Sequence, residues 1–269
     1  MSATARMRAI VAVVAIAAAA VVAGVVYATR QDPAQPKALC KRAGVYVVPG
    51  VASSHVAAVR RALAKPASAA ARELEPLANE YPGDPVVQYN EAAALFCAGY
   101  VNEATVAFRR AKKAGRDTQY EVQADNILHP QFFQDGYPPF EYLGHDPLLV
   151  QGQIAQRNYH QRTAERLWAR AASLHPHDPA TQVAAAVGRF DMDDLSASFS
   201  RLGPLVERFP KSQTVRFHLG LLLVWTGQAK QALVELRDAQ RLGPETPMGR
   251  EAAKLLAGVA KTGTNRSQR

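Results

Sequence analysis

Cysteines and aromatic residues are scarce in this chain of 269 residues. There are two cysteines, Cys40 and Cys97, and aromatic residues make up 7% of the sequence. Two cysteines are too few for a disulfide-dense mini-scaffold, a four-cysteine zinc site or a cluster-binding site. Glycine and proline, at 17 residues each, exclude collagen-like and low-complexity classes. The apolar share of 48% excludes a disordered chain, so we expect a folded body with one large core or an elongated stack.

The positive charge is concentrated at the two ends of the chain. The formal net charge is +9, of which residues 1–42 carry +5 and residues 250–269 carry +4. The body between them is therefore balanced. A nucleic-acid binder needs basic side chains clustered on its folded surface, so we expect no nucleic-acid partner.

The N-terminal region contains a long uncharged run. Residues 9–28 hold twenty residues without a charge, enough for a helix that crosses the roughly 30 Å hydrocarbon layer. We predict a tail at 1–8, a transmembrane anchor at 9–28 and a linker at 29–50. The alternative is a signal peptide with its cleavage site after Val26-Tyr27-Ala28, which would release a secreted protein.

Arginines and lysines flank the run on both sides, so the positive-inside rule barely sets its orientation. The short tail before the span resembles a signal-anchor, which favours a single-pass membrane protein with its body outside the cytoplasm. A cytoplasmic body is the alternative. In an extracytoplasmic compartment Cys40 and Cys97 could pair, or they could be two separate buried thiols; the sequence leaves both open.

A regular period runs through the body. Pro176, Pro210 and Pro244 are spaced by 34. The same spacing relates Trp168, Leu202 and Leu236, then Ala164, Ser198 and Ala232, and nearer the N-terminus it relates Ala70 to Ala104 and Leu74 to Phe108. Five matches to one period indicate a repeat architecture.

Three repeats carry a common pattern at matching positions. They read Arg216, Leu219, Gly220, Leu223, Ala232, Leu236, Pro244 in one, Gln88, Glu91, Ala92, Leu95, Ala104, Phe108 in another, and Leu148, Gln151, Gly152, Ala155, Ala164, Trp168, Pro176 in the third. The repeat at 179–212 has Ser198 at the usual alanine, and the first, 51–84, matches only in its second half. On these residues the chain resembles the tetratricopeptide repeat family, whose pattern is W-x2-L-G-x2-Y, A-x3-F, P, and within it the bacterial membrane-anchored members.

The resemblance covers residues 51–118 and 145–246. It implies an all-α fold, a solenoid of about five helix pairs preceded by the one transmembrane helix. Gly99 and Gly227 share the position between two helical runs, where a left-handed turn is needed. Gly152 and Gly220 occupy the position where paired helices cross. We predict a capping helix at 247–261 and a disordered tail at 262–269.

The register breaks at residues 119–144, which form an irregular aromatic insertion. A further helix is expected at 120–128, ended by Pro130. The aromatic rings that follow either fold back to fill the seam between the two halves or form a loop that binds a partner or a second copy.

No catalytic or metal-binding arrangement stands out. His175, His177 and Asp178 fall on a repeat junction, and Asp194 is expected to cap a helix. We therefore expect neither an enzyme nor a cofactor or metal. The family's working surface is the concave groove lined by the first helix of each repeat, with Ala93, Leu149, Gln153 and Gln156 among its lining here. The predicted partner-binding residues are Tyr89, Phe96, Phe217, Leu221, Trp225, Phe133, Tyr137 and Phe140.

The leading hypothesis is a membrane-anchored scaffold that binds a protein or peptide in this groove at the cell envelope. Internal packing of the same rings between repeats is the alternative for each of them. The rival hypotheses are an enzyme or regulatory domain with a site in the insertion, drawing on His129, Asp135, Glu141 and His145, and a self-assembling structural protein.

The register makes a stability prediction at Ala232. Replacing it with leucine should overpack its helix pair and lower the free energy of unfolding by roughly 1–3 kcal/mol. Thermal unfolding measures the effect, and an unchanged melting temperature would contradict the assigned register.

Overall fold

The computed structural model describes residues 39–40, 44–130 and 136–266, and it contains helices joined by turns and extended segments. The described residues hold no β-strand, which confirms the predicted all-α fold class for this part of the chain. The predicted anchor at 9–28 lies outside the described residues. Among those that are described, no helix combines the length and apolar character needed to cross a membrane.

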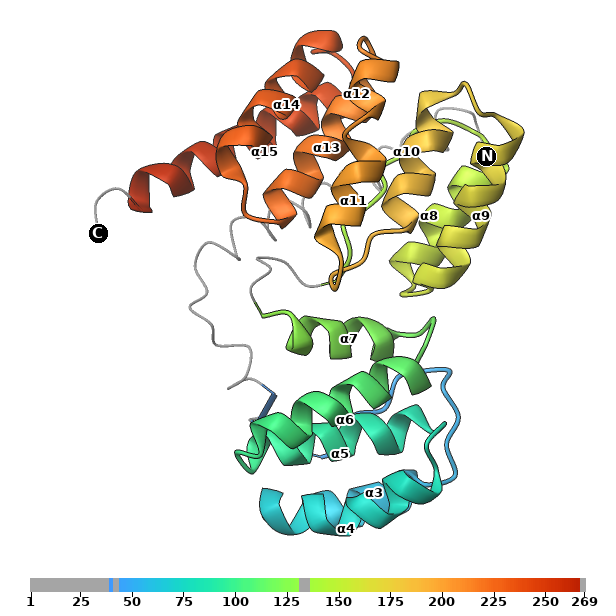
Figure 1. Cartoon of the computed structure of the whole chain (residues 1–269), viewed down its shortest axis with the longest axis vertical. Helices are drawn as coiled ribbons and strands as arrows, with labels where there is room; N and C mark the ends of the chain where they lie inside the picture. Colours follow the sequence, from blue (N-terminus) through green and yellow to red (C-terminus); the bar gives the residue numbers. More distant parts are fainter. Residues whose placement is uncertain (1–38, 41–43, 131–135, 267–269) are drawn as a thin grey trace, which may run out of the picture.

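Most helices follow one another in pairs (Figure 1). The pairs are α3 (Val56–Leu63) with α4 (Ala67–Glu80), α5 (Pro85–Cys97) with α6 (Val101–Ala114), α8 (Pro147–Arg157) with α9 (Gln161–Leu174), α10 (Pro179–Gly188) with α11 (Leu195–Leu202) and the short α12 (Leu205–Arg208), and α13 (Gln213–Trp225) with α14 (Ala229–Leu242). Two helices stand apart from this scheme, α7 (Gln119–Leu128) and α15 (Pro247–Arg266).

Three of the first helices, α5, α8 and α10, begin in the same way. Asp84, Asp146 and Asp178 each accept backbone N–H groups at the start of α5, α8 and α10, and each is followed by a proline. An aspartate cap with proline at the first helical position satisfies donors that a helix start leaves open. Thr118 stands one repeat period after Asp84 and caps α7 in the same way. The helix expected at 120–128 is thus present, and it begins where a first helix belongs, but the described residues that follow it form no second helix before α8.

The predicted glycine positions are confirmed. Gly99 and Gly227 have φ angles of 85° and 75°, in the left-handed region, in the turns between paired helices. At Gly152 an added Cβ would lie 2.2 Å from Trp168 Nε1, so only glycine lets α8 and α9 approach this closely.

The proline and serine positions also have structural causes. The helices α4, α9, α12 and α14 each end two residues before a predicted proline, at Pro82, Pro176, Pro210 and Pro244. Ser198 replaces the usual alanine because its buried hydroxyl accepts from the Asp191 N–H at 3.2 Å and donates to the Asp194 carbonyl at 3.2 Å. It thereby fixes the loop that leads into α11.

The apolar core divides at α7. One cluster joins α3–α7 with residues 45–51, and a second joins α8–α14 with residues 137–142. A third, smaller cluster packs α13 and α14 against α15. In Figure 1 the first group forms the lower half of the molecule and the second the upper half. The interruption of the repeat register therefore separates two hydrophobic cores.

The structure extends the sequence analysis at both ends of the described chain. The terminal helix α15 was expected to end at 261 but continues to Arg266. Cys40 and Cys97 form a disulfide, which decides between the two alternatives that the sequence left open. The bridge closes a loop of 57 residues, for which the chain-entropy model gives about 4 kcal/mol of stabilisation.

The crossing of α8 and α9 generates a stability prediction. Gly152→Ala would push the buried indole of Trp168 out of position and should cost roughly 1–3 kcal/mol of unfolding free energy. Gly83→Ala is the matched control, because a Cβ there meets nothing within 4 Å. Urea denaturation compares the two variants, and equal midpoints would refute the close crossing.

Candidate functional site: two extended segments on the first-helix face

Residues 44–50 run as an extended segment across α5 and α7, and we call them the N-terminal strap. The Tyr46 N–H donates to Asn90 Oδ1 at 2.8 Å, and Asn90 Nδ2 donates to the Tyr46 carbonyl at 2.9 Å. The carboxamide thus bonds both polar groups of one residue, as a neighbouring β-strand would. Asn90 is buried on α5, where a backbone without partners would carry a free-energy penalty.

Tyr120 on α7 completes the contact with the N-terminal strap. Its hydroxyl accepts from the Val48 N–H at 3.1 Å and donates to the Tyr46 carbonyl at 3.0 Å. Burial raises the pKa of Tyr120 to about 12, so the phenol keeps the proton that it donates. The Tyr46 ring packs against Tyr89 and Tyr120, with centroids 4.9 and 5.4 Å away. The strap is therefore held by backbone hydrogen bonds and by aromatic contacts together.

Residues 137–143 form a second extended segment, the inner strap, which lies on α8 and α13. Gln156 Oε1 accepts from the Phe140 N–H at 2.9 Å, and Gln153 Nε2 donates to the Phe140 carbonyl at 3.1 Å. Gln156 Nε2 also donates to the Pro138 carbonyl at 3.1 Å. From α13, His218 Nε2 accepts from the Glu141 N–H at 2.9 Å. Side chains of two first helices thus form hydrogen bonds with the backbone of the inner strap, just as Asn90 does with the backbone of the N-terminal strap.

Apolar contacts seat the inner strap. The Phe140 ring is 1% exposed and lies 5.1 Å from both the Trp168 and the His218 rings, centroid to centroid. Pro138 and Pro139 line a small cavity together with residues of α10, α11 and α13. The described part of the insertion therefore packs within the core of the second half, whereas the alternative from the sequence had its rings fill the seam between the two halves.

His218 is a neutral imidazole in this setting. Its Nδ1 lies 2.7 Å from the Thr214 carbonyl, so Nδ1 carries the hydrogen and Nε2 is free to accept from Glu141 N–H. Complete burial lowers the pKa of His218 to about 4. A proton on Nε2 would turn this nitrogen into a donor that faces the Glu141 N–H. The hydrogen bond from the inner strap to His218 would then be lost.

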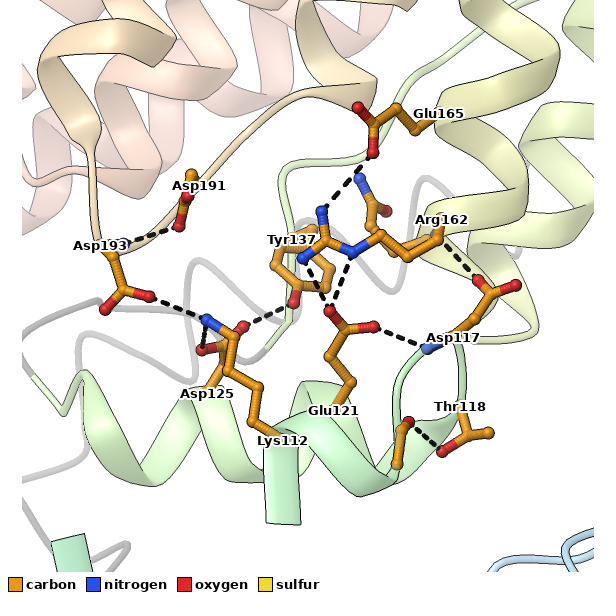
Figure 2. A network of polar contacts seen from close by, with 12 residues as sticks. Lys112, Asp117, Thr118, Glu121, Asp125, Tyr137, Arg162, Glu165, Asp191 and Asp193 are labelled. Atoms are coloured by element: carbon orange, nitrogen blue, oxygen red, sulfur yellow. Dashed lines mark hydrogen bonds and ion pairs between the residues drawn. The ribbon is translucent and has the colours of Figure 1, made fainter. Parts of the chain in front are cut away.

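Between the halves lies a network of charged groups, the polar seam (Figure 2). Arg162 on α9 donates from Nε and Nη2 to Glu121 Oε1 on α7, at 2.9 and 2.7 Å. Asp117 accepts from the Arg162 and Thr163 N–H groups at 2.8 and 3.0 Å. It therefore caps α9, whose own N-cap residue, His160, makes no side-chain cap bond. The carboxylate of one half completes a helix start in the other.

A second part of the polar seam centres on Lys112. Its Nζ lies 2.7 Å from Asp125 Oδ1 on α7 and 2.9 Å from Asp193 Oδ2 in the loop before α11. Burial opposes the charge of Lys112, but the two carboxylates outweigh it and raise its pKa. Tyr137 donates to Asp125 Oδ2 at 2.5 Å, and burial together with nearby carboxylates raises the pKa of Tyr137. The start of the inner strap is thereby fastened to α7.

One group of described residues has the arrangement of a metal site. Ligand atoms of Asp125, His129 and Asp193 lie within 4.8 Å of one another. The Lys112 ammonium contacts both carboxylates, so the cluster already contains its own cation. The geometry is that of an ion-pair network.

The structure places the predicted partner-binding residues mainly inside the protein. Tyr89, Phe140, Phe217, Leu221 and Trp225 are buried. Phe217 and Leu221 pack against α15, Tyr89 contacts the N-terminal strap, and Phe140 is itself part of the inner strap. These five side chains therefore pack inside the protein, which was the alternative to partner binding for each of them. Phe96 and Tyr137 are half-buried, and Phe133 lies outside the described residues.

The residues of the enzyme hypothesis have separate partners. His129 contacts Asp193 at 3.0 Å in the polar seam, Glu141 lies 3.6 Å from Arg157, and His145 is exposed. Asp135 lies outside the described residues. Gln153 and Gln156 do line the face as expected, whereas Asn90 and His218 were not anticipated there.

Comparison with known proteins adds no identification. The sequence matches no protein-family model, and no curated protein is significantly similar to it.

The buried imidazole generates a pH prediction. The folded pKa of His218 is about 4 and the unfolded value about 6.5, so the unfolded chain takes up a proton first as the pH falls. The contribution of His218 to the free energy of unfolding is complete above pH 6.5. It decreases by roughly 3 kcal/mol as the pH falls toward 4. Urea unfolding at pH 7 and pH 5 should show a smaller loss for His218→Gln than for the parent.

The control for this experiment is His177→Gln, at an exposed histidine in the turn before α10. It should follow the parent at both pH values. An equal loss in the His218 variant would show that this imidazole does not carry the effect.

Proposed function

We propose that the chain is a membrane-anchored scaffold of tetratricopeptide-like helix pairs that binds extended segments of a protein partner at the cell envelope. The observation that carries the proposal is the pair of straps. Two segments without sequence relation to the helices lie on first helices, and in both the side chains of those helices bond the backbone. A face that bonds backbone groups accepts an extended polypeptide with little dependence on its side chains.

The helix starts support a solenoid of repeated pairs. Second helices begin at positions 67 and 101, and again at 161, 195 and 229, with a constant spacing of 34 inside each half. The first helices α10, α13 and the terminal helix α15 begin at 179, 213 and 247 with the same spacing. Such regular stacking buries each pair against its neighbour and leaves the first helices as one continuous face.

The compartment is proposed from two further features. The uncharged run at 9–28 has the length of a transmembrane helix. The Cys40–Cys97 disulfide is typical of an oxidising compartment outside the cytoplasm. A membrane anchor would confine the face near the envelope and raise its effective concentration for membrane-bound or secreted partners.

The proposal predicts position-dependent crosslinking. A photo-crosslinking amino acid is introduced into the full chain at Phe96 on α5 or at Tyr142 in the inner strap, and the chain is expressed in native membranes. We expect a defined polypeptide adduct at both sites, because a bound segment would pass next to them.

The matched control sites are Val106 and Val234, which are 54% and 52% exposed on the second helices α6 and α14. They should give no adduct of the same mass. Adducts of equal yield at all four sites, or none beside the straps, would contradict binding on the first-helix face.

A further inference from the structure

We infer that the N-terminal strap is a built-in occupant of the α5–α7 face, and that reduction of the Cys40–Cys97 bridge by a dithiol opens this face to an extended, uncharged partner segment containing an aromatic residue. The inference rests on the proposed function for the identity of the partner. The gating itself rests on how the strap is held.

The strap is fastened at both ends. After it, Ser53 Oγ donates to Asp84 Oδ2 at 2.6 Å, and His55 Nδ1 lies 2.8 Å from the same oxygen. Asp84 also caps α5, so the chain just after the strap is bonded to the start of that helix. Before the strap, the Cys40 bridge is attached at Cys97, the last residue of α5. The strap therefore spans α5 from one end to the other.

The two straps differ in how they are closed. The inner strap is joined through the main chain to α7 on one side and to α8 on the other. Both cysteines of the chain form the disulfide that precedes the N-terminal strap, so no disulfide holds the inner strap. The N-terminal strap is joined to the repeats by the main chain only on its α3 side. On its other side the covalent link to the repeats is the disulfide. A single reversible reaction can therefore free one end of this strap, while the inner strap stays in place.

The bridge is placed for thiol–disulfide exchange. Cys40 is exposed and Cys97 is half-buried. A dithiol reductant attacks Cys40 Sγ through its thiolate, forms a mixed disulfide, and releases Cys97 as a thiolate that takes up a proton. The second thiol of the reductant then attacks the mixed disulfide, which frees Cys40 as a thiol and leaves the reductant as a cyclic disulfide.

Loss of the bridge lowers the effective concentration of the strap at its own face. The face then offers Asn90 to bond one backbone residue in both directions, and the rings of Tyr89 and Tyr120 to pack against an aromatic side chain. The strap itself, GVYVVPG, carries no charge and one aromatic residue. A partner segment of the same chemistry would make the same contacts.

The direct test uses the full chain and a fluorescent peptide of sequence GVYVVPG, blocked at both ends. We expect binding to be at least about tenfold tighter after treatment with dithiothreitol than in the oxidised protein, and the double variant Cys40→Ser, Cys97→Ser to bind like the reduced chain. Asn90→Ala should weaken binding to the reduced chain. Asn102→Ala, at an exposed asparagine on α6, is its matched control and should not.

Hydrogen exchange gives a second readout within the same molecule. On reduction, the Tyr46 and Val48 amides should exchange at least about tenfold faster, because their acceptors Asn90 and Tyr120 are released. The Phe140 and Glu141 amides of the inner strap should keep their protection. Equal acceleration of all four would indicate general loosening and would overturn the gating.

Peptide binding that is equal in both redox states, or absent in the reduced chain, would also overturn the inference. These outcomes are separable from failure of the proposed function. Crosslinking at Tyr142 reports on the helices under the inner strap and does not depend on the disulfide. Absence of an adduct there would contradict the proposed envelope partner, but it would leave redox gating of the α5–α7 face untouched.

Discussion

An extended segment that packs on helices, outside any β-sheet, needs a hydrogen-bond partner for each backbone group that it turns toward the protein. This requirement shapes both halves of the molecule. Asn90 and Tyr120 meet it for the N-terminal strap, and Gln153, Gln156 and His218 meet it for the inner strap. Because the partners stand on first helices, the helical stack acts as a substitute for a neighbouring strand. The same arrangement would serve a polypeptide from another molecule.

The polar seam joins the two halves of the helical stack at the point where, among the described residues, α7 has no second helix to complete its pair. Within the described chain α7 has no second helix to cover it, and the next pair begins beyond the insertion. Glu121 and Asp117 meet α9 there with a charge pair and a helix cap. Buried ion pairs of this kind add little net stability, since desolvation offsets their attraction, but a misaligned pair would leave a charge unpaired. The seam therefore fixes how one half sits on the other.

The sequence predicted those features that repeat and missed those that occur once. Prolines one period apart mark helix ends, and Gly99 and Gly152 mark a turn and a crossing, because each reflects a local constraint that recurs from pair to pair. Asn90 and Tyr46 are 44 positions apart, and His218 and Glu141 are 77 apart. No periodicity links such partners. The cap that Asp117 gives to α9 likewise depends on the folded arrangement, and for the same reason the sequence left the pairing of Cys40 with Cys97 open.

The disulfide also determines how mechanical load enters the protein. With the bridge closed, residues 41–96 form a covalent loop between Cys40 and Cys97. Tension applied to the chain before Cys40 passes across the sulfur atoms directly to the end of α5. The N-terminal strap, α3 and α4 are then shielded from the pull. With the bridge open, the same tension would act along the strap and peel it from its face, beginning at the Tyr46–Asn90 contact.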